Sequence, residues 1–296
     1  MLTSDRFGLT WHPALAPDIA RARERVDTLE VIPEVALRAT RGDRDFLRIL
    51  SKEIPISLHG VSLGLASASP VEEWRLDEMA RLVEEVQPED WSEHLAFVRA
   101  GGIELCHLAA PPRTDAVLEG LTGNLRRARR IVGSAPALEN VATLLDPPGS
   151  TCDEQTWLCD VLRASEGPLL LDLHNVLTNA ANLHYDAKAF VRALPLGRIT
   201  TVHIAGGTEA ADAASGLTLR VDDHRHDVPA DVFELLTLVG ALAPQPLTIV
   251  LEREGAFPPF AQLLDELARA REALAAGRRA AADTRQSADL PGRRAR

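Results

Sequence analysis

The stretch GPLLLDLHN at residues 167–175 is a short apolar run, bounded by Gly and Pro, that finishes in Asp, His and Asn. A run of this length is typical of a strand buried on both faces, as in a parallel sheet. Seven other runs have the same character, and they lie at residues 7–11, 28–33, 55–60, 90–95, 136–141, 198–206 and 246–254. The run at 90–95 is the weakest and does not predict a strand by itself.

Helix-length segments separate these runs. They cover residues 14–26, 43–53, 70–87, 114–132, 153–165, 186–194, 229–241 and 258–276. Eight strands that alternate with eight helices predict an α/β fold, a closed (β/α)₈ TIM barrel. A doubly wound open sheet is the competing fold, but it would be expected to carry a glycine-rich phosphate turn, and the chain has neither GxGxxG nor a Walker sequence.

The chain of 296 residues has a suitable length for one such barrel. We expect a single catalytic, metal-binding domain over residues 1–274. From residue 275 the sequence becomes small, polar and basic and loses its apolar periodicity. Residues 275–296 are therefore predicted to form a disordered tail.

Composition narrows the class of protein. The net charge of −11 argues against a nucleic-acid partner, because phosphate binding requires a basic face. Three cysteines without CxxC spacing are too few for a disulfide framework. No charged leader with an apolar core is visible, and no run approaches the ~20 apolar residues of a membrane span. We expect a cytoplasmic enzyme without a membrane partner.

Ionisable residues end seven of the eight apolar runs. In a barrel these strand ends surround one mouth on the C-terminal face, where such folds carry out their chemistry. A single residue of this kind has an ordinary structural explanation, but seven are hard to obtain from barrel stability alone. Several carboxylates buried around one axis also require neutralising cations. The residues are Glu30 and Glu34, His59, His94, Glu139, Asp172, His203 and Glu252.

Two motifs extend this set. In LLLDLHN (169–175), Asp172 and His174 share a face if the strand continues, and Asn175 could reach the site as the chain turns. The motif VDDHRHD (221–227) follows the seventh run, and a charged surface loop is its alternative interpretation. It offers Asp222, Asp223, His224 and His226.

The candidate ligands are imidazoles and carboxylates, without a cysteine. This chemistry favours Fe, Mn or Zn over soft copper or iron–sulfur sites, and it is too rich in nitrogen for a pure Mg or Ca site. A bridging carboxylate is needed to hold two ions ~3.5–4 Å apart. Glu139, on the middle strand of the set, is the candidate bridge, and we expect two or three metal ions.

Seven motifs occur in the order found in one known family. They are HGVSLGLAS (59–67), SEHL (92–95), LENV (138–141), LLLDLHN (169–175), VHIAGG (202–207), DDHRHDV (222–228) and LERE (251–254). Over residues 7–274 the chain resembles the multinuclear non-heme iron-dependent oxidative enzymes, which include the oxidase of methanobactin biosynthesis.

The resemblance implies a xylose-isomerase-type barrel that holds two or three irons (Fe²⁺/Fe³⁺). It also implies an oxidoreductase that uses O₂ to modify residues, often cysteines, of a ribosomally made precursor peptide in natural-product biosynthesis. A partner protein commonly presents the peptide in this family.

By motif match the resemblance assigns metal binding to nine positions. We expect a catalytic role for His174 and Glu30, while Glu30, Glu93 and Asn140 would tune the metals from behind their ligands. The nine positions are His59, His94, Glu139, Asp172, Asn175, His203, Asp222, His224 and Glu252.

The chain departs from the family pattern at three places. Gly207 stands where the family often has a His, and His174 stands where it commonly has an Asn. The stretch CHLAAPPRT (106–114) replaces an acidic loop rich in Leu and Pro. These changes leave the expected ligands intact and concern the substrate and the reaction.

Two other classes of function fit the same ligands. A non-redox barrel enzyme, such as a sugar isomerase or a phosphodiesterase, would use two divalent ions as Lewis acids. The chain has only Lys52 and Lys188, neither at a strand end, which disfavours an isomerase. A non-catalytic metal-binding partner protein is the other alternative.

Overall fold

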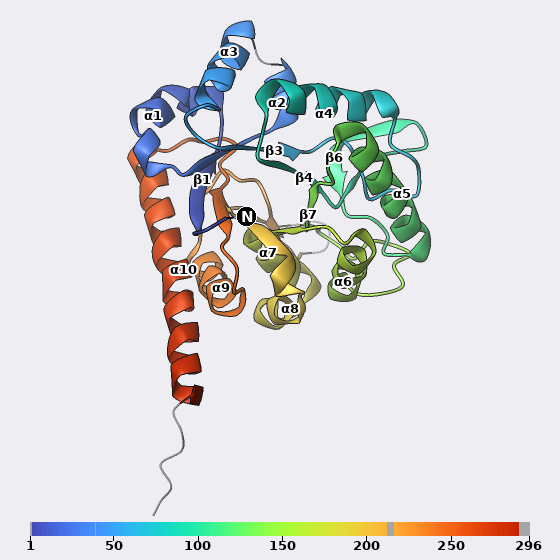
Figure 1. Cartoon of the computed structure of the whole chain (residues 1–296). Coiled ribbons are helices and arrows are strands. Elements are labelled where there is room, and N and C mark those ends of the chain that lie inside the picture. Colours follow the sequence, from blue (N-terminus) through green and yellow to red (C-terminus); the bar gives the residue numbers. More distant parts are fainter. Residues whose placement is uncertain (1, 39, 212–215, 290–296) are drawn as a thin grey trace, which may run out of the picture.

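Eight parallel strands form a closed barrel in the computed structural model, which describes residues 2–38, 40–211 and 216–289 (Figure 1). The order around the barrel follows the chain, and the last strand pairs with the first. The predicted fold is therefore confirmed. The strands are β1 (Arg6–Thr10), β2 (Thr28–Val31), β3 (Ile56–Gly60), β4 (Asp90–His94), β7 (Ala137–Glu139), β8 (Leu169–Asp172), β9 (Ile199–Ile204) and β12 (Thr248–Leu251).

Helices cover the outside of the barrel (Figure 1). Segment 114–132 forms a helix as predicted, and the Thr114 hydroxyl caps its first turn by accepting from Val117 N. The helices are α1 (Ala16–Arg21), α2 (Pro33–Arg38), α3 (Arg41–Leu50), α4 (Glu73–Val86), α5 (Asp115–Val132), α6 (Glu154–Ser165), α7 (Leu173–Leu183), α8 (Ala187–Ala193), α9 (Ala230–Leu242) and α10 (Phe260–Asp289). Short 3₁₀ turns occupy Pro13–Leu15, Arg23–Arg25 and Leu196–Arg198. None of the described helices is long and apolar enough to cross a membrane.

The weakest of the eight apolar runs, residues 90–95, forms the barrel strand β4. It pairs in parallel with β3 on one side and β7 on the other, and its residues 91–94 are buried. Periodicity does not predict this strand because its sequence is polar. Ser92 and His94 point into the barrel interior, where each has a polar partner.

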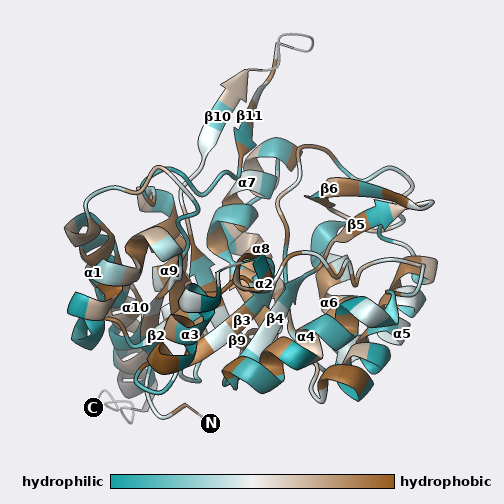
Figure 2. Ribbon diagram, turned by 90° about the horizontal axis from the view of Figure 1, so that it is seen from above, coloured by the Kyte–Doolittle hydropathy of each residue, from teal (hydrophilic) through white to brown (hydrophobic). Residues whose placement is uncertain are grey.

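Two hairpins that the periodicity did not predict follow barrel strands at the C-terminal face (Figure 2). The first pairs β5 (Phe97–Ala100) with β6 (Ile103–Ala109), and the second pairs β10 (Thr208–Ala211) with β11 (Thr218–Val221). Their residues are mostly exposed, so they lack the apolar runs that mark the barrel strands.

The strand predicted within residues 167–175 ends at Asp172. Asp172 and His174 therefore do not lie on the same face of one strand. Asp172 is the last residue of β8 and the N-cap of α7, where its carboxylate accepts from Asn175 N. An Asp that caps a helix ends the strand before it. Asp172 and His174 therefore reach the mouth from a strand end and from a first helical turn.

The predicted tail is corrected as far as Asp289. Residues 275–289 continue helix α10, because the segment is rich in alanine, the best helix former, and is anchored to the barrel. Arg278 donates to Asp5 Oδ1 at 2.9 Å and to Gln245 O at 2.7 Å. The domain limit expected at residue 274 thus falls inside a helix, and residues 290–296 lie outside the described residues.

Arg278→Ala should lower the free energy of unfolding by about 1.5–3 kcal/mol, since hydrogen bonds to charged groups are lost from a half-buried site. Urea unfolding of the full chain measures this. Arg285→Ala on the exposed part of the same helix is the control and should change stability by less than about 0.5 kcal/mol. Equal stability of the two variants would contradict the anchoring role.

Candidate metal centre

The ends of β3, β4 and β7 bring two imidazoles onto one carboxylate. Nε2 of His59 lies 3.0 Å and Nε2 of His94 3.2 Å from Glu139 Oε2. The three residues are buried, and their ligand atoms lie within 4.8 Å of one another. This group could hold one metal ion.

A second group shares Glu139. Nδ1 of His203 lies 3.4 Å from Glu139 Oε1 and 3.1 Å from Glu252 Oε2. Asp172 completes the group, whose four ligand atoms also lie within 4.8 Å of one another. Because Glu139 offers one oxygen to each group, it could bridge two ions if both groups were occupied, which is the role that the sequence suggested for it.

A third group lies beyond Glu252. Nδ1 of His224 is 3.5 Å from Glu252 Oε2 and 3.7 Å from Glu254 Oε1. Nε2 of the same ring lies 2.8 Å from Asp222 Oδ1, which His174 Nδ1 approaches to 2.7 Å. Sequence reasoning missed Glu254, although its spacing of two from Glu252 in LERE was the available signal.

Three of the imidazoles are oriented by contacts at the ring nitrogen that does not face the centre. Nδ1 of His94 donates to Gly60 O at 2.9 Å, and Nδ1 of His59 lies 2.8 Å from the Ser92 hydroxyl. Nε2 of His203 lies 3.0 Å from Glu30 Oε2. In each case the other ring nitrogen faces the centre, which is the usual arrangement of a metal-binding histidine.

Burial and charge oppose each other at these groups. Burial lowers the pKa of His59, but Glu139 and Glu30 outweigh it and raise that pKa to about 9. Burial raises the pKa of Asp172 well above its ordinary value, and Asp222 and Glu139 add to this rise. Without a metal cation, the repulsion between these carboxylates is relieved only when they take up protons or when the neighbouring imidazoles are protonated.

The donors fit a metal. Buried side-chain atoms without a hydrogen-bond partner cost free energy unless another group satisfies them. Several such atoms belong to the predicted metal-binding residues at the strand ends and in the segments that follow them. They include His59 Nε2, Glu139 Oε2, Asp172 Oδ2, Asn175 Oδ1, His203 Nδ1, His224 Nε2 and Glu252 Oε2.

The structure brings most predicted residues to this centre, but not all. Glu34 and Glu93 are not part of the three groups: Glu34 accepts from Val61 N at 3.3 Å, and burial and the negative charge of Glu34 raise the pKa of Glu93 well above its ordinary value. Asp223 and His226 contact each other at 3.0 Å, with His226 about half exposed. These two residues of VDDHRHD therefore belong to the surface, as the alternative interpretation of the motif expected.

The two single-residue departures from the family pattern touch each other. A Cβ on Gly207 would collide with His174 Cε1 and lie 2.8 Å from His174 Nε2. It would also collide with Val221 O, a backbone atom. The imidazole of His174 thus fills the space that a side chain at position 207 would need.

A family model described as RiPP precursor modification enzyme MbnB/TglH/ChrH matches residues 6–275. A UPF0276 protein of Streptomyces avermitilis is 33% identical over 276 residues, which cover 90% of this chain and 54% of that protein. The chain therefore spans about half the length of that relative. A UPF0276 protein of Rhizorhabdus wittichii is 32% identical, with 87% of this chain and 90% of that protein covered.

Solved structures share the fold at low identity. A xylose isomerase domain containing protein from Salmonella typhimurium aligns with a TM-score of 0.60 and 12% identity, covering 91% of this chain and 97% of that one. A 3-keto-D-glucoside 4-epimerase from E. coli aligns with a TM-score of 0.56 and 14% identity, covering 91% and 100%. These neighbours support the xylose-isomerase-type barrel.

Glu139→Gln should reduce bound metal in two groups at once, because it removes the charge that they share. We expect at least tenfold weaker binding of Fe²⁺ under anaerobic conditions, measured by elemental analysis after dialysis. Glu154→Gln neutralises a half-buried carboxyl outside the centre and should leave the metal content unchanged. Equal metal content in the two variants would argue against Glu139 as a ligand.

Gly207→Ala should destabilise the protein by about 1–3 kcal/mol, the usual cost of an overpacked site. The double variant His174→Ala with Gly207→Ala should recover only part of this loss, because the collision with Val221 O remains. Gly123→Ala, where an added Cβ meets nothing within 4 Å in helix α5, is the matched control and should be neutral or stabilising. Chemical denaturation compares the variants, and equal effects at both glycines would refute the collision.

Proposed function

Since this chain belongs to the MbnB/TglH/ChrH family of RiPP precursor modification enzymes, we propose that it is a multinuclear iron-dependent oxidase that modifies a precursor peptide with O₂. A RiPP is a ribosomally synthesised and post-translationally modified peptide. Cysteine is the residue that we expect to be modified. The observation that carries the proposal is the sharing of Glu139 and Glu252 between adjacent groups of ligands, which is how carboxylates hold several ions together.

The nitrogen and oxygen donors, without cysteine, support iron as the metal. Bound iron would activate O₂ and hold a substrate thiolate, whose pKa a nearby cation lowers. The chain itself supplies a buried mouth in which His59, His203 and Glu139 are almost completely excluded from water.

Two residues support the chemistry without belonging to the three groups. Glu30 contacts His203 Nε2 rather than the centre, so we propose a positioning role for it in place of the catalytic role expected from the sequence. His174 is held at Nδ1 by Asp222, and its Nε2 lies on the side of Gly207. We propose that His174 accepts or donates a proton at Nε2 near the bound peptide.

A partner protein that presents the peptide is part of the proposal, because the family resemblance implies one. We also propose that the reaction takes place in the cytoplasm, where ribosomes make the precursor.

The test uses anaerobically purified full chain reconstituted with Fe²⁺ and a short cysteine-containing peptide encoded beside its gene. We expect two or three irons per chain, O₂ uptake that depends on the peptide, and a mass change on the peptide. His174→Gln should slow the reaction at least tenfold while it retains iron, as expected for the loss of a group that transfers protons.

Zinc at no more than one ion per chain, together with no O₂ uptake after iron reconstitution, would overturn the oxidase. Turnover of a sugar or phosphodiester with any divalent ion would instead indicate a non-redox barrel enzyme. Metal binding without any turnover would indicate a metal-binding partner protein.

A further inference from the structure

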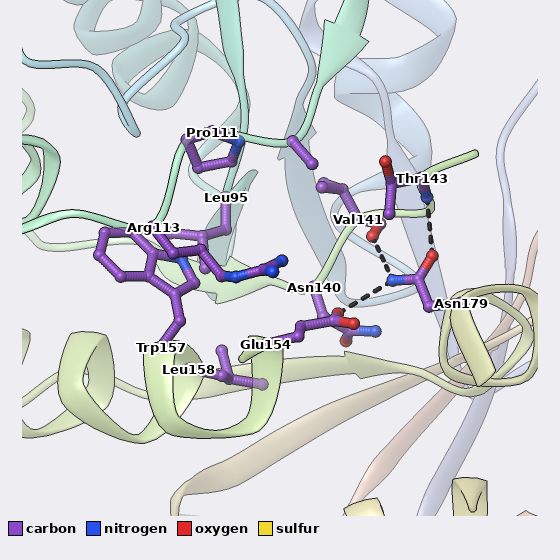
Figure 3. A pocket seen from close by; sticks show the side chains of 11 residues that line it. Leu95, Pro111, Arg113, Asn140, Val141, Thr143, Glu154, Trp157, Leu158 and Asn179 are labelled. Carbon is purple, nitrogen blue, oxygen red and sulfur yellow. Dashed lines mark hydrogen bonds between the residues drawn. The ribbon is translucent and has the colours of Figure 1, made fainter. Parts of the chain in front are cut away.

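A groove of about 720 Å³ opens between the start of α6 and the turn that joins α7 to α8. Arg113 and Glu154 line both this groove and a smaller inner cavity of about 20 Å³ (Figure 3). The groove has the size of a site for a small ligand or a few side chains, whereas the inner cavity has room for about one atom group.

The inner cavity lies behind the barrel wall that carries the metal ligands. Its lining residues Leu95 and Asn140 directly follow His94 and Glu139 in the chain. Asn140 also pairs with the backbone of Asp172, accepting from its N at 2.9 Å and donating to its O at 3.0 Å. The inner cavity is therefore built from the same strand ends as the metal centre, and the groove beside it is lined by the loop that follows β7 on the same C-terminal face.

The charge of the groove is negative. Its one described lining cation, Arg113, is already bound to Asp146 and to Cys152 O. Three further carboxylates line the groove without an ion pair to a described cation, and two of them cap α6 and α8. They are Asp153, Glu154 and Asp186.

Glu154 is the deepest of these carboxylates, because it also lines the inner cavity. It accepts from Asn179 Nδ2 at 2.9 Å and from the Tyr185 hydroxyl at 3.1 Å. Burial raises its pKa to about 7, although these two hydrogen bonds and Arg113 lower it. A cation that entered the groove would stabilise the ionised form.

A second, independent feature is the indole of Trp157 in the same cavity (Figure 3). The side chain is only 4% exposed, and its Nε1–H has no hydrogen-bond partner. A buried donor of this kind is unfavourable unless an acceptor reaches it. Apolar surface lies nearby, since Tyr185 stacks on Phe190 with ring centroids 5.3 Å apart, and both line the groove.

We propose that this groove binds a cationic, partly apolar segment of the substrate peptide, with a Lys or Arg side chain at Glu154 and a carbonyl oxygen that reaches Trp157 Nε1 in the adjoining inner cavity. The identification of the occupant as substrate rests on the proposed function. The carboxylates that line the groove favour a basic segment, and the stacked rings of Tyr185 and Phe190 favour apolar residues beside it. Because the groove and the mouth open on one face, the same peptide can continue from this segment to the metal centre.

The test measures binding of two fluorescein-labelled decapeptides to the metal-loaded full chain by fluorescence polarisation. One alternates Lys with Leu, and the other alternates Glu with Leu. We expect the Lys peptide to bind and the Glu peptide to bind at least tenfold more weakly. Glu154→Gln should weaken binding of the Lys peptide at least tenfold, and Trp157→Phe several-fold.

Glu119→Gln is the matched control, because it removes the same charge from an exposed position on α5. It should change the affinity less than twofold, which separates the groove from a general attraction to an acidic protein. The pH dependence gives a second readout. Affinity for the Lys peptide should rise as pH increases through about 7, because Glu154 ionises there. Burial and Glu154 raise the pKa of Tyr185, and backbone hydrogen bonds lower the pKa of Asp153 and of Asp186, so these groups do not titrate in the same range. The rise should be absent in Glu154→Gln.

Equal affinities of Glu154→Gln and Glu119→Gln, or equal binding of both peptides, would overturn the groove proposal. The two proposals fail separately. If the groove variants do not change binding but O₂ uptake still depends on the peptide, the peptide binds elsewhere. If the Lys peptide binds specifically but no O₂ is taken up, the groove proposal stands and the oxidase is rejected.

Discussion

The charge balance around Glu139 is the constraint on which the centre depends. Its carboxylate lies within 3.4 Å of ring nitrogens of three histidines, deep inside the barrel. Burial raises the pKa of Glu139, yet these imidazoles hold it well below its ordinary value. A carboxylate in this position is stable only with positive charge beside it. Either protonated imidazoles or metal cations must therefore lie beside Glu139. The buried side-chain atoms there that have no hydrogen-bond partner favour cations.

The barrel meets this constraint through alternation along its strands. Ser92 and His94 face the interior, where Ser92 meets His59, while Glu93 between them is directed toward Gly60 and Met79. Successive residues of one strand thus point to opposite faces, one toward the barrel interior and the next away from it. The same logic places Asn140 beside Glu139, where it fixes the backbone of Asp172. A single strand end therefore contributes both to the candidate metal centre and to the wall of the inner cavity.

The fold and the centre differ in how much the sequence reveals. Buried parallel strands carry continuous apolar runs, so the barrel was predictable, and so were the ionisable residues at the ends of seven runs. Asp172 ends its strand as predicted, but His174 does not share a strand face with it, because the same carboxylate also caps a helix and nothing in the sequence marks that second role. The helix beyond residue 275 was missed because alanine and arginine suit a helix as well as a disordered tail, and only the contacts of Arg278 distinguish them. Glu254 and the contact of Gly207 with His174 depend on loop geometry, which no periodicity encodes.

The anchoring of Arg278 to Asp5 has a consequence for biosynthesis. The first barrel strand pairs with the last, from Arg6 opposite Thr248 onward, and Arg278 then joins the two ends of the barrel from outside. On the ribosome, a chain that has reached residue 240 already carries most of the ligands but has no partner for one edge of β1. Closure of the ring is thus a late event with large loop-closure entropy, completed after α10 has emerged. Glu252 directly follows this last barrel strand, so the set of candidate ligands at the barrel mouth and the closed barrel are completed together.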